Sequence, residues 1–491
     1  MPTAPLSLRR LIRNWISLAG AIIATGSFFA FLLLFSLDMF AQHGNPYMGI
    51  LAYAVAPGFL LLGVVLVLAG YLISRRQELR GSAGAPVLAL TIDLSRERDR
   101  KLLTIFAVAG VVFLFMTALG SYQTYHFTES VQFCGQACHL PMDPEFVTAQ
   151  HSPHARVECV ACHVGNGASA YVKTKISGMR QLYHVMRNDF ERPIGITIGK
   201  LRPARETCEQ CHWPQKFTGG FERTFHHYLA DEKNTPFSVR LLVNVGGGDP
   251  ERGPVGGIHW HMNLANKIEY IATDDQQRVI PWVKHTDAKG VVTEYRNPDF
   301  KGDLSKYQKR TMDCLDCHNR PSHNFLSPNQ AVDLALSSGR LDAHIPWVKA
   351  KIVEALIQPY STKAEALQKI EARLRAAYPD KAQADAVVAE AQSIYKNNFF
   401  PEMKADWRAY PDHLSHKEWD GCFRCHDGKH KTADSKASIK ANDCRACHLI
   451  LAQGNDEDVK KMDAAGHEFM HIDAEYSDFS CSECHTGATP K

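Results

Sequence analysis

The sequence predicts a mainly α-helical fold, in which a three-helix transmembrane anchor precedes a second part with little regular structure and a small β insert. Three observations predict it. Long apolar stretches are confined to residues 1–121, all 14 cysteines lie after them, and each cysteine pair recurs with histidine at nearly constant spacing. The 55 basic and 52 acidic side chains nearly balance, so the charge gives no case for a nucleic-acid partner.

Three apolar stretches, at about residues 15–37, 49–73 and 102–121, form the predicted anchor. None contains a charged residue, and each approaches or exceeds the roughly 20 helical residues that cross a bilayer. The third is the shortest and could instead be a buried helix of a soluble protein, but it is apolar on all sides. We therefore predict that residues 1–121 are a three-span membrane anchor.

Positive charge predicts the orientation of this anchor. Basic residues gather before the first span and between the second and third: Arg9, Arg10, Arg13, Arg75, Arg76, Arg80, Arg96, Arg98, Arg100 and Lys101. The segment 38–48, between the first two spans, has neither lysine nor arginine. The positive-inside rule then predicts a cytoplasmic N-terminus and places the chain after residue 121 on the periplasmic side of a bacterial inner membrane. No A-x-A cleavage site follows a short apolar region, so the first span is expected to remain as an anchor.

Every cysteine belongs to one repeated motif, a cysteine pair followed directly by histidine. The seven motifs are Cys134, Cys138 and His139; Cys159, Cys162 and His163; Cys208, Cys211 and His212; Cys314, Cys317 and His318; Cys422, Cys425 and His426; Cys444, Cys447 and His448; and Cys481, Cys484 and His485. CxxCH is the spacing of covalent haem attachment, in which the histidine ligates the iron. Zinc knuckles or disulfides would not require histidine after every second cysteine. We predict a multihaem cytochrome c domain with seven c-type haems, of which the first is held by the irregular motif CGQACH.

Further side chains are expected to ligate the irons from the opposite face. The sequence has 24 histidines, and the 17 outside the motifs suffice to give nearly every iron two protein ligands, which is typical of electron transfer. Proximity to a motif favours five of them: His154, His323, His416, His430 and His471. His259 and His261, in GGIHWHM, would face the same side of a strand, so one of them is expected to be a ligand, with His226 and His227 as weaker alternatives. Met142 could ligate the first haem or be an ordinary buried methionine.

The predicted periplasmic part has three regions. Residues 122–325 hold the first four motifs and a β insert at about 236–298, with strand-like runs at 238–245, 268–272, 279–283 and 291–295. Residues 326–415 are predicted to be a solvated helical spacer that packs one apolar stripe, with a stop at Pro359 and a capping box of Thr362 and Glu365. Residues 416–491 are a C-terminal trihaem region, and outside the spacer haem itself is expected to form the core.

Four sequence segments in this order resemble the NapC/NirT/NrfH family of tetrahaem quinol dehydrogenases: CGQACHLPM, HARVECVACHVG, LRPARETCEQCHWP and CLDCHNRPSH. The resemblance covers roughly residues 100–325, so that 122–325 is a NapC/NirT-like tetrahaem region. With its three spans and three additional C-terminal motifs, the full layout is most similar to the ImcH type of heptahaem inner-membrane cytochromes of metal-respiring bacteria.

The resemblance implies an enzyme that oxidises menaquinol from the membrane quinone pool and passes electrons to periplasmic c-type cytochromes, in anaerobic or extracellular electron transfer. It implies that His154 ligates the fourth haem, that His323 ligates the second, and that the first haem lies beside the quinol. Lys175, or Lys173 next to it, would contact the quinol. His184 or Asp189 would take the place of the family's acid, which makes Lys175, His184 and Asp189 the candidate catalytic residues.

Two other functions are consistent with a multihaem chain. One is a reductase that acts on a small oxyanion at a haem with an open coordination position, although the CxxCK motif frequent in such enzymes is absent. The other is a non-catalytic haem protein that docks partners or senses a signal. No kinase-like or nucleotide-binding segment favours the latter.

Overall fold

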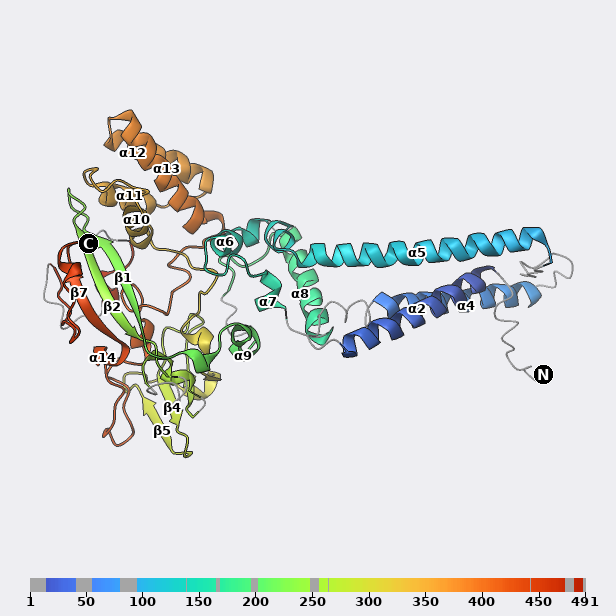
Figure 1. Ribbon diagram of the computed structural model, residues 1–491, viewed down its shortest axis with the longest axis horizontal. Coiled ribbons are helices and arrows are strands. Elements are labelled where there is room, and N and C mark those ends of the chain that lie inside the picture. The colour runs from blue at the N-terminus through green and yellow to red at the C-terminus, as the bar shows by residue number, and fades with distance from the viewer. Residues whose placement is uncertain are drawn as a thin grey trace. The chain divides into compact units, whose positions relative to one another are not determined.

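The computed structural model describes residues 15–40, 55–79, 95–137, 139–164, 168–195, 202–247, 256–263, 265–441, 443–472 and 481–488 (Figure 1). The chain divides into two compact units. The N-terminal unit consists of Met1–Ala137 and Cys159–Met186, and the C-terminal unit of Cys138–Glu158 and Arg187–Lys491. Cys138 lies outside the described residues, and for His139 the description is limited to the backbone.

Helices make up the described part of the N-terminal unit. They are α2 (Trp15–Phe40), α4 (Ala56–Leu79), α5 (Glu97–Glu129), a π-helical turn (Phe133–Ala137), α7 (Cys159–His163) and α8 (Ala168–Arg187). Helices α2 and α4 pack closely because glycine removes the side chain at their crossing: a Cβ on Gly20 would lie 2.6 Å from the carbonyl oxygen of Gly63. Ser17 on α2 also donates a hydrogen bond of 3.2 Å to the carbonyl oxygen of Val67.

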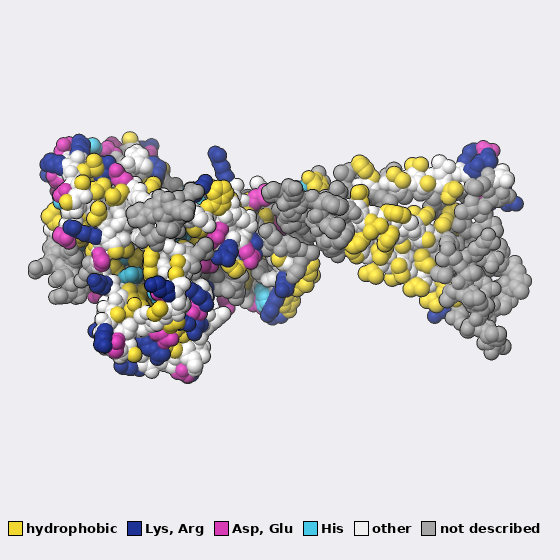
Figure 2. Space-filling view, turned by 60° about the horizontal axis from the view of Figure 1, so that its bottom comes forward, with side chains coloured by type: hydrophobic (Ala, Val, Ile, Leu, Met, Phe, Trp, Pro, Cys, Tyr) yellow, Lys and Arg dark blue, Asp and Glu magenta, His cyan; other side chains and the backbone are white. Residues whose placement is uncertain are grey.

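Helices α2 and α4 are long and apolar enough to cross a membrane. Trp15–Leu34 has a mean hydropathy of 2.1 and Ala56–Ser74 one of 2.3, yet only 17% of each stretch is buried. Side chains such as Phe29 and Leu61 face outward with exposed fractions of 65% and 64%, and Figure 2 shows a broad yellow surface over these helices. Such a surface is suited to lipid as the surrounding solvent. The third apolar stretch lies within α5, which is helical throughout.

Two small antiparallel sheets stand in the C-terminal unit. One has the order β1-β2-β7, made of Gly220–Tyr228, Pro236–Asn244 and His448–Gly454. The other has the order β5-β4-β3-β6, made of Val292–Arg296, Trp282–Thr286, Lys267–Ile271 and Lys309–Thr311. The four strand-like runs of the sequence correspond to β2–β5, but the sheets reach beyond 236–298, because β1 precedes that range and β6 and β7 follow it.

The main apolar core of the C-terminal unit is built by four helices of the region 326–415. These are α10 (Pro328–Ser337), α11 (Val348–Leu356), α12 (Lys363–Ala377) and α13 (Lys381–Asn398). Val332, Ile352 and Ile370 have no exposed surface and belong to one continuous cluster. The apolar stripes of these helices face one another and bury a core that needs no haem, so the region is more extensively packed than a solvated spacer with one apolar stripe.

The predicted stop is present, but only half of the predicted capping box forms, because the carboxylate of Glu365 accepts its hydrogen bond from the backbone N–H of Ser361, at 2.9 Å, instead of from that of Thr362. Helix α11 ends at Leu356, shortly before Pro359, and the side chain of Thr362 caps α12 by accepting a hydrogen bond from the backbone N–H of Glu365. The remaining helices of the unit are short: α6 (His139–Gln150), α9 (Ala204–Thr207), α14 (Cys444–Cys447) and α15 (Cys481–Cys484).

Candidate haem-binding site

The described residues of each motif include a short helical turn. The turns are Phe133–Ala137, Cys159–His163, Cys208–Gln210, Cys314–Asp316, Gly421–Arg424, Cys444–Cys447 and Cys481–Cys484. Where the turn is tight, the motif histidine donates its backbone N–H to the carbonyl oxygen of the first cysteine, as from His318 to Cys314 at 2.8 Å. One turn of helix brings both cysteines and the imidazole of a motif to one side, as attachment to one macrocycle requires.

From the third motif to the sixth, motifs that follow one another in the C-terminal unit are also neighbours in space. Cys208 of the third motif and Cys314 of the fourth pack in one apolar cluster. Burial raises the pKa of the Cys317 thiol to about 12, and the nearby Cys422 of the fifth motif contributes to the rise. Burial likewise raises the pKa of the Cys447 thiol in the sixth motif to about 11, again with Cys422 as a contributing neighbour. Haems held by these motifs would therefore lie close to one another.

In the N-terminal unit a cysteine of the first motif lies beside one of the second. A hydrogen bond between the thiols of Cys134 and Cys159 is the largest of several causes that raise the pKa of Cys134, and burial is the second. The nearby carboxylate of Glu129 contributes to the same rise. The two cysteines belong to different motifs, so haems attached there would be close neighbours.

Five motif histidines each face a second histidine. The pairs, with the distances between their ring centroids, are His212 with His154 at 6.0 Å, His318 with His259 at 6.3 Å, His426 with His261 at 5.9 Å, His448 with His416 at 6.2 Å, and His485 with His471 at 5.9 Å. Imidazole nitrogens bind transition metals at about 2 Å. Two imidazoles on opposite sides of one iron therefore have ring centres roughly 6 Å apart, which is the separation of all five pairs.

Hydrogen bonds orient the rings of His259 and His261. In each ring Nδ1 donates to a backbone carbonyl oxygen, of Val245 at 3.1 Å and of Ile258 at 2.8 Å respectively. Such a bond leaves the lone pair of Nε2 for a metal. Burial lowers the pKa of both rings, which favours the neutral form that ligates iron.

His154 and His323 are oriented in the same way. Their Nδ1 atoms lie 3.0 Å from the carbonyl oxygen of Pro321 and 2.9 Å from that of Glu145. Burial lowers the pKa of His323 to about 4, so this ring is neutral at pH 7. The pairing of His154 with His212 differs from the family expectation, which assigned His154 to the fourth haem. In the structure His259 faces the fourth motif instead.

The segment GIHWHM is not the strand that the sequence favoured. It forms a 3₁₀ helix, Ile258–Met262, in which residues two apart point in different directions. His259 and His261 therefore face two different motifs instead of sharing one side. The segment approaches the chain after β2 so closely that a Cβ on Gly247, whose φ is +98°, would lie 2.3 Å from the carbonyl carbon of His259.

His430 has a different role from the ligand role predicted for it. Its ring is fully buried. Nδ1 lies 2.8 Å from a carboxylate oxygen of Asp427, and Nε2 lies 2.6 Å from the carbonyl oxygen of Ile280. Because both ring nitrogens are engaged, neither is available to iron. His430 instead ties the segment after the fifth motif to the loop before β4.

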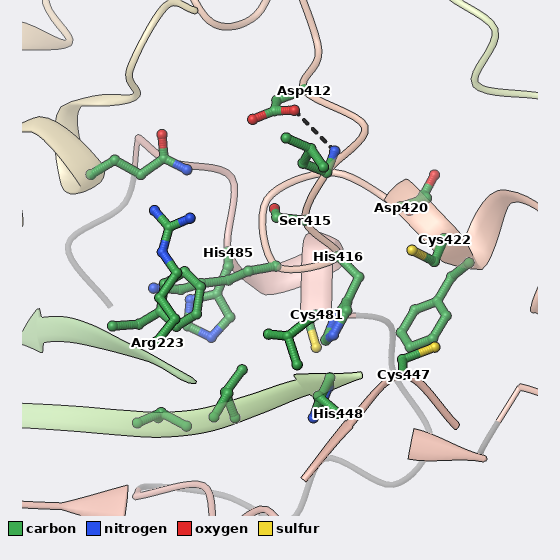
Figure 3. A pocket seen from close by; sticks show the side chains of 18 of the residues that line it. Arg223, Asp412, Ser415, His416, Asp420, Cys422, Cys447, His448, Cys481 and His485 are labelled. Carbon is green, nitrogen blue, oxygen red and sulfur yellow. Dashed lines mark hydrogen bonds between the residues drawn. The ribbon is translucent and has the colours of Figure 1, made fainter. Parts of the chain in front are cut away.

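A cavity of about 3800 Å³ runs through the C-terminal unit and is lined by residues of the last four motifs and by His154, His261, His416 and His471. Pockets for one small molecule have volumes of about 300–1,000 Å³, so this cavity can hold several large planar groups. Figure 3 shows His416 and His448 within it, near Cys447 and Cys481.

Half-buried Arg320 supplies an independent test of the fit to haem. It lines the cavity, stacks over the ring of Tyr410 at 4.3 Å, and its Nε and Nη2 have no hydrogen-bond partner among the described residues. Burial lowers the pKa of Arg320 and the charges of Glu145 and Asp412 act to raise it, but neither carboxylate bonds to these two buried nitrogens. Buried charged donors need an acceptor, and a haem propionate is an anion of that kind. The cysteines, the facing imidazoles, the cavity and this cation together fit haem.

The three candidate catalytic residues are divided between the two units. Lys175 and His184 lie on α8 in the N-terminal unit, whereas Asp189 belongs to the C-terminal unit and pairs with Arg187 at 3.2 Å. His184 contacts the ring of Tyr183. Met142 is half-buried on α6, one turn after His139, and its role as a ligand stays a prediction.

Lys175 instead forms an ion pair with a residue that the sequence did not single out. Its Nζ lies 2.5 Å from Oε1 of Glu129, whose side chain is only 5% exposed. The other oxygen of Glu129, Oε2, is buried without a hydrogen-bond partner among the described residues. Glu129 is the first acidic residue after the third apolar stretch, and this position is the signal by which it could have been found.

Comparison with known proteins gives two matches of different extent. Residues 96–197, which contain the first two motifs, Glu129 and Lys175, match the model of the NapC/NirT cytochrome c family, N-terminal region. The chain is 41% identical over 494 residues to the cytochrome c-type protein ImcH of Geobacter sulfurreducens, and the match covers 97% of this chain and 95% of that protein. No solved structure matches the chain.

Proposed function

We propose that this chain, which belongs to the NapC/NirT cytochrome c family and is a membrane cytochrome c of electron transfer, oxidises menaquinol and delivers the electrons to periplasmic c-type cytochromes. The observation that carries the proposal is the ion pair of Lys175 and Glu129 beside the first two motifs. The physiological setting would be anaerobic or extracellular electron transfer.

The proposed location is the bacterial inner membrane, with α2, α4 and α5 as three spans. The absence of basic residues from 38–48 and their abundance around 75–101 support a cytoplasmic N-terminus. In this arrangement α5 starts on the cytoplasmic side and ends on the periplasmic side. All seven motifs come after α5 and would therefore lie in the periplasm.

The proposed cofactors are seven c-type haems, attached through the 14 cysteines and ligated by the seven motif histidines. The five histidine pairs support two imidazole ligands at the third to seventh irons. His323 is the proposed second ligand of the second iron, and Met142 remains the candidate at the first. We leave His430 out of this set because both of its ring nitrogens are engaged.

Oxidation of menaquinol releases two electrons and two protons, so the site needs groups that accept electrons and groups that accept protons. The first two motifs would hold the haems that accept the electrons. Oε2 of Glu129 is positioned to accept a proton, because it has no hydrogen-bond partner among the described residues. Lys175 holds Oε1 of the same carboxylate at 2.5 Å, and its positive charge also favours a deprotonated quinol oxygen nearby.

The alternative, a reductase of a small oxyanion, needs an iron with an open coordination position. The five facing histidine pairs weigh against such a position at five of the seven motifs. We therefore favour electron transfer without substrate chemistry at haem.

Lys175→Gln and Glu129→Gln should each slow haem reduction by a menaquinol analogue at least tenfold, since a positioned proton-transfer group contributes about 10²–10⁴-fold to such a step. Reduction by dithionite, which needs no quinol site, should keep its wild-type rate. Stopped-flow absorbance in the haem bands measures both. Lys173→Gln is the matched control, because Lys173 is exposed on the same helix. Wild-type quinol rates in both variants would exclude this pair as the quinol site, and turnover of an oxyanion would favour the reductase.

A further inference from the structure

The outward face of α8 carries an exposed apolar stripe. Val172, Ile176, Met179, Tyr183 and Met186 are spaced alternately four and three residues apart, which confines them to an arc of about 80° on a helix. Their exposed fractions are 46%, 63%, 73%, 50% and 72%. A helix on the surface of a water-soluble domain turns such a stripe toward the core. Helix α8 turns it outward.

Cations follow one edge of this stripe. Lys173 and Arg180 are exposed and lie about 80–100° from its centre on the helix. The helix contains no aspartate or glutamate. Figure 2 shows yellow and dark-blue side chains next to one another in this region. An apolar face bordered by basic residues complements the acyl chains and the anionic headgroups of a lipid surface.

The attachment of α8 agrees with that partner. Figure 1 shows α8 running across the end of α5 and not along it, and Lys175 joins it to Glu129 at the last residue of α5. Residues 102–128 contain no Asp, Glu, Lys or Arg, and as a helix they are about 40 Å long. A bilayer with its headgroups is about 40–45 Å thick, so Glu129 would reach the periplasmic headgroups. This step rests on the proposed third span but not on the proposed quinol chemistry.

We infer that α8 lies in the plane of the periplasmic membrane surface, with its apolar stripe among the acyl chains and Lys173 and Arg180 against lipid phosphates. Lipid of the bilayer therefore covers the stripe. In this position the Lys175–Glu129 pair lies at the boundary of the lipid, where a molecule that diffuses within the bilayer can reach it without entering water.

Single introduced cysteines test the inference in the full-length holoprotein, since haem attachment uses all native thiols. Ile176→Cys and Met179→Cys report on the stripe, Gln181→Cys on the opposite side of α8, and Val111→Cys on the middle of α5. Each variant is placed, one copy per disc, in nanodiscs of phosphatidylcholine and phosphatidylglycerol. The discs also contain a lipid with a diazirine in its acyl chain. The rate of labelling by a membrane-impermeant maleimide is measured by mass, and lipid crosslinks are mapped by peptide mass spectrometry. The protein without an introduced cysteine gives the background.

We expect positions 176 and 179 to label at least tenfold more slowly than position 181, with lipid crosslinks within 176–187. Equal labelling at the three positions, with position 111 protected, would overturn the inference while leaving the third span intact. Labelling of position 111 as fast as 181 would overturn the third span as well. Slow labelling without crosslinks, or only in discs with two copies, would mean that protein covers the stripe. Because no readout uses menaquinol, quinol oxidation can fail or succeed independently.

Discussion

Replacing His259 by alanine should leave one iron of the holoprotein with an open coordination position and convert that haem from low to high spin. The rings of His259 and His318 lie 6.3 Å apart and are parallel within 2°, which fits two imidazoles on opposite sides of one iron. Attachment should persist, because it depends on Cys314 and Cys317. Electron paramagnetic resonance of the ferric protein measures the spin state, and a pyridine haemochrome assay measures haem content.

Two other histidines serve as controls for this prediction. His226 bonds to the hydroxyl of Ser238 at 2.9 Å, and both ring nitrogens of His430 are engaged. His226→Ala and His430→Ala should therefore leave every low-spin signal in place. A high-spin signal in His430→Ala would show that His430 is a haem ligand after all. An unchanged spectrum in His259→Ala would show that His259 is not one.

Asp333→Ala should lower the free energy of unfolding by about 3–5 kcal/mol, the usual cost of removing one partner of a buried ion pair. Nζ of Lys349 lies 2.6 Å from Oδ1 of Asp333, and the two side chains are only 6% and 5% exposed. Asp333 also accepts hydrogen bonds from the ring of His227 and the backbone N–H of Tyr228. The variant would leave the charge of Lys349 buried without its counter-ion, which denaturant unfolding followed by circular dichroism would detect.

The surface pair of Arg375 and Asp385, 2.7 Å apart, provides the matched control. Because both side chains are over 40% exposed, Asp385→Ala should cost only about 0–1 kcal/mol. If Asp333→Ala costs no more than this, the buried pair does not stabilise the fold.

Acid should reduce the stability difference between wild type and Asp333→Ala. Burial acts to raise the pKa of Asp333, but its hydrogen bond to His227 and its pairing with Lys349 outweigh this and keep the pKa below its ordinary value. A carboxylate with a lowered folded-state pKa stabilises the fold above the unfolded value, about 3.9, and loses this contribution as the pH falls through the folded pKa. The difference should therefore be full near neutral pH and decline below about pH 4.

The sequence predicts well where chemistry requires a fixed local pattern. CxxCH specifies a single turn with two thiols and an imidazole, and uncharged stretches in 15–37 and 49–73 specify helices that lipid can surround. Capping by Thr362 is also local, because the donor is only three residues away. Each of these features depends on residues within a few positions of one another.

Features that depend on distant residues were not predicted. The partner of Lys175 lies 46 residues before it in the chain, and no periodicity connects the two. The pairing of β2 with β7 joins segments from different predicted regions. His430 follows a motif as a ligand would, but its environment is decided by Ile280, 150 residues earlier. The side chains of His259 and His261 point in different directions because the segment forms a 3₁₀ turn. The alternating positions of the two histidines in the sequence had favoured a strand.

The pairing of β2 with β7 has a consequence for the biogenesis of the protein. A chain is synthesised from its N-terminus, so β2 acquires β1 early, whereas its other edge waits for β7, which begins at His448 in the sixth motif. Until then β2 presents an open row of backbone donors and acceptors, which promotes pairing with other chains. A chain that stops before the last motifs would keep this edge permanently. The C-terminal region therefore covers this edge of β2, and we expect chains truncated before β7 to aggregate more readily than the full-length protein.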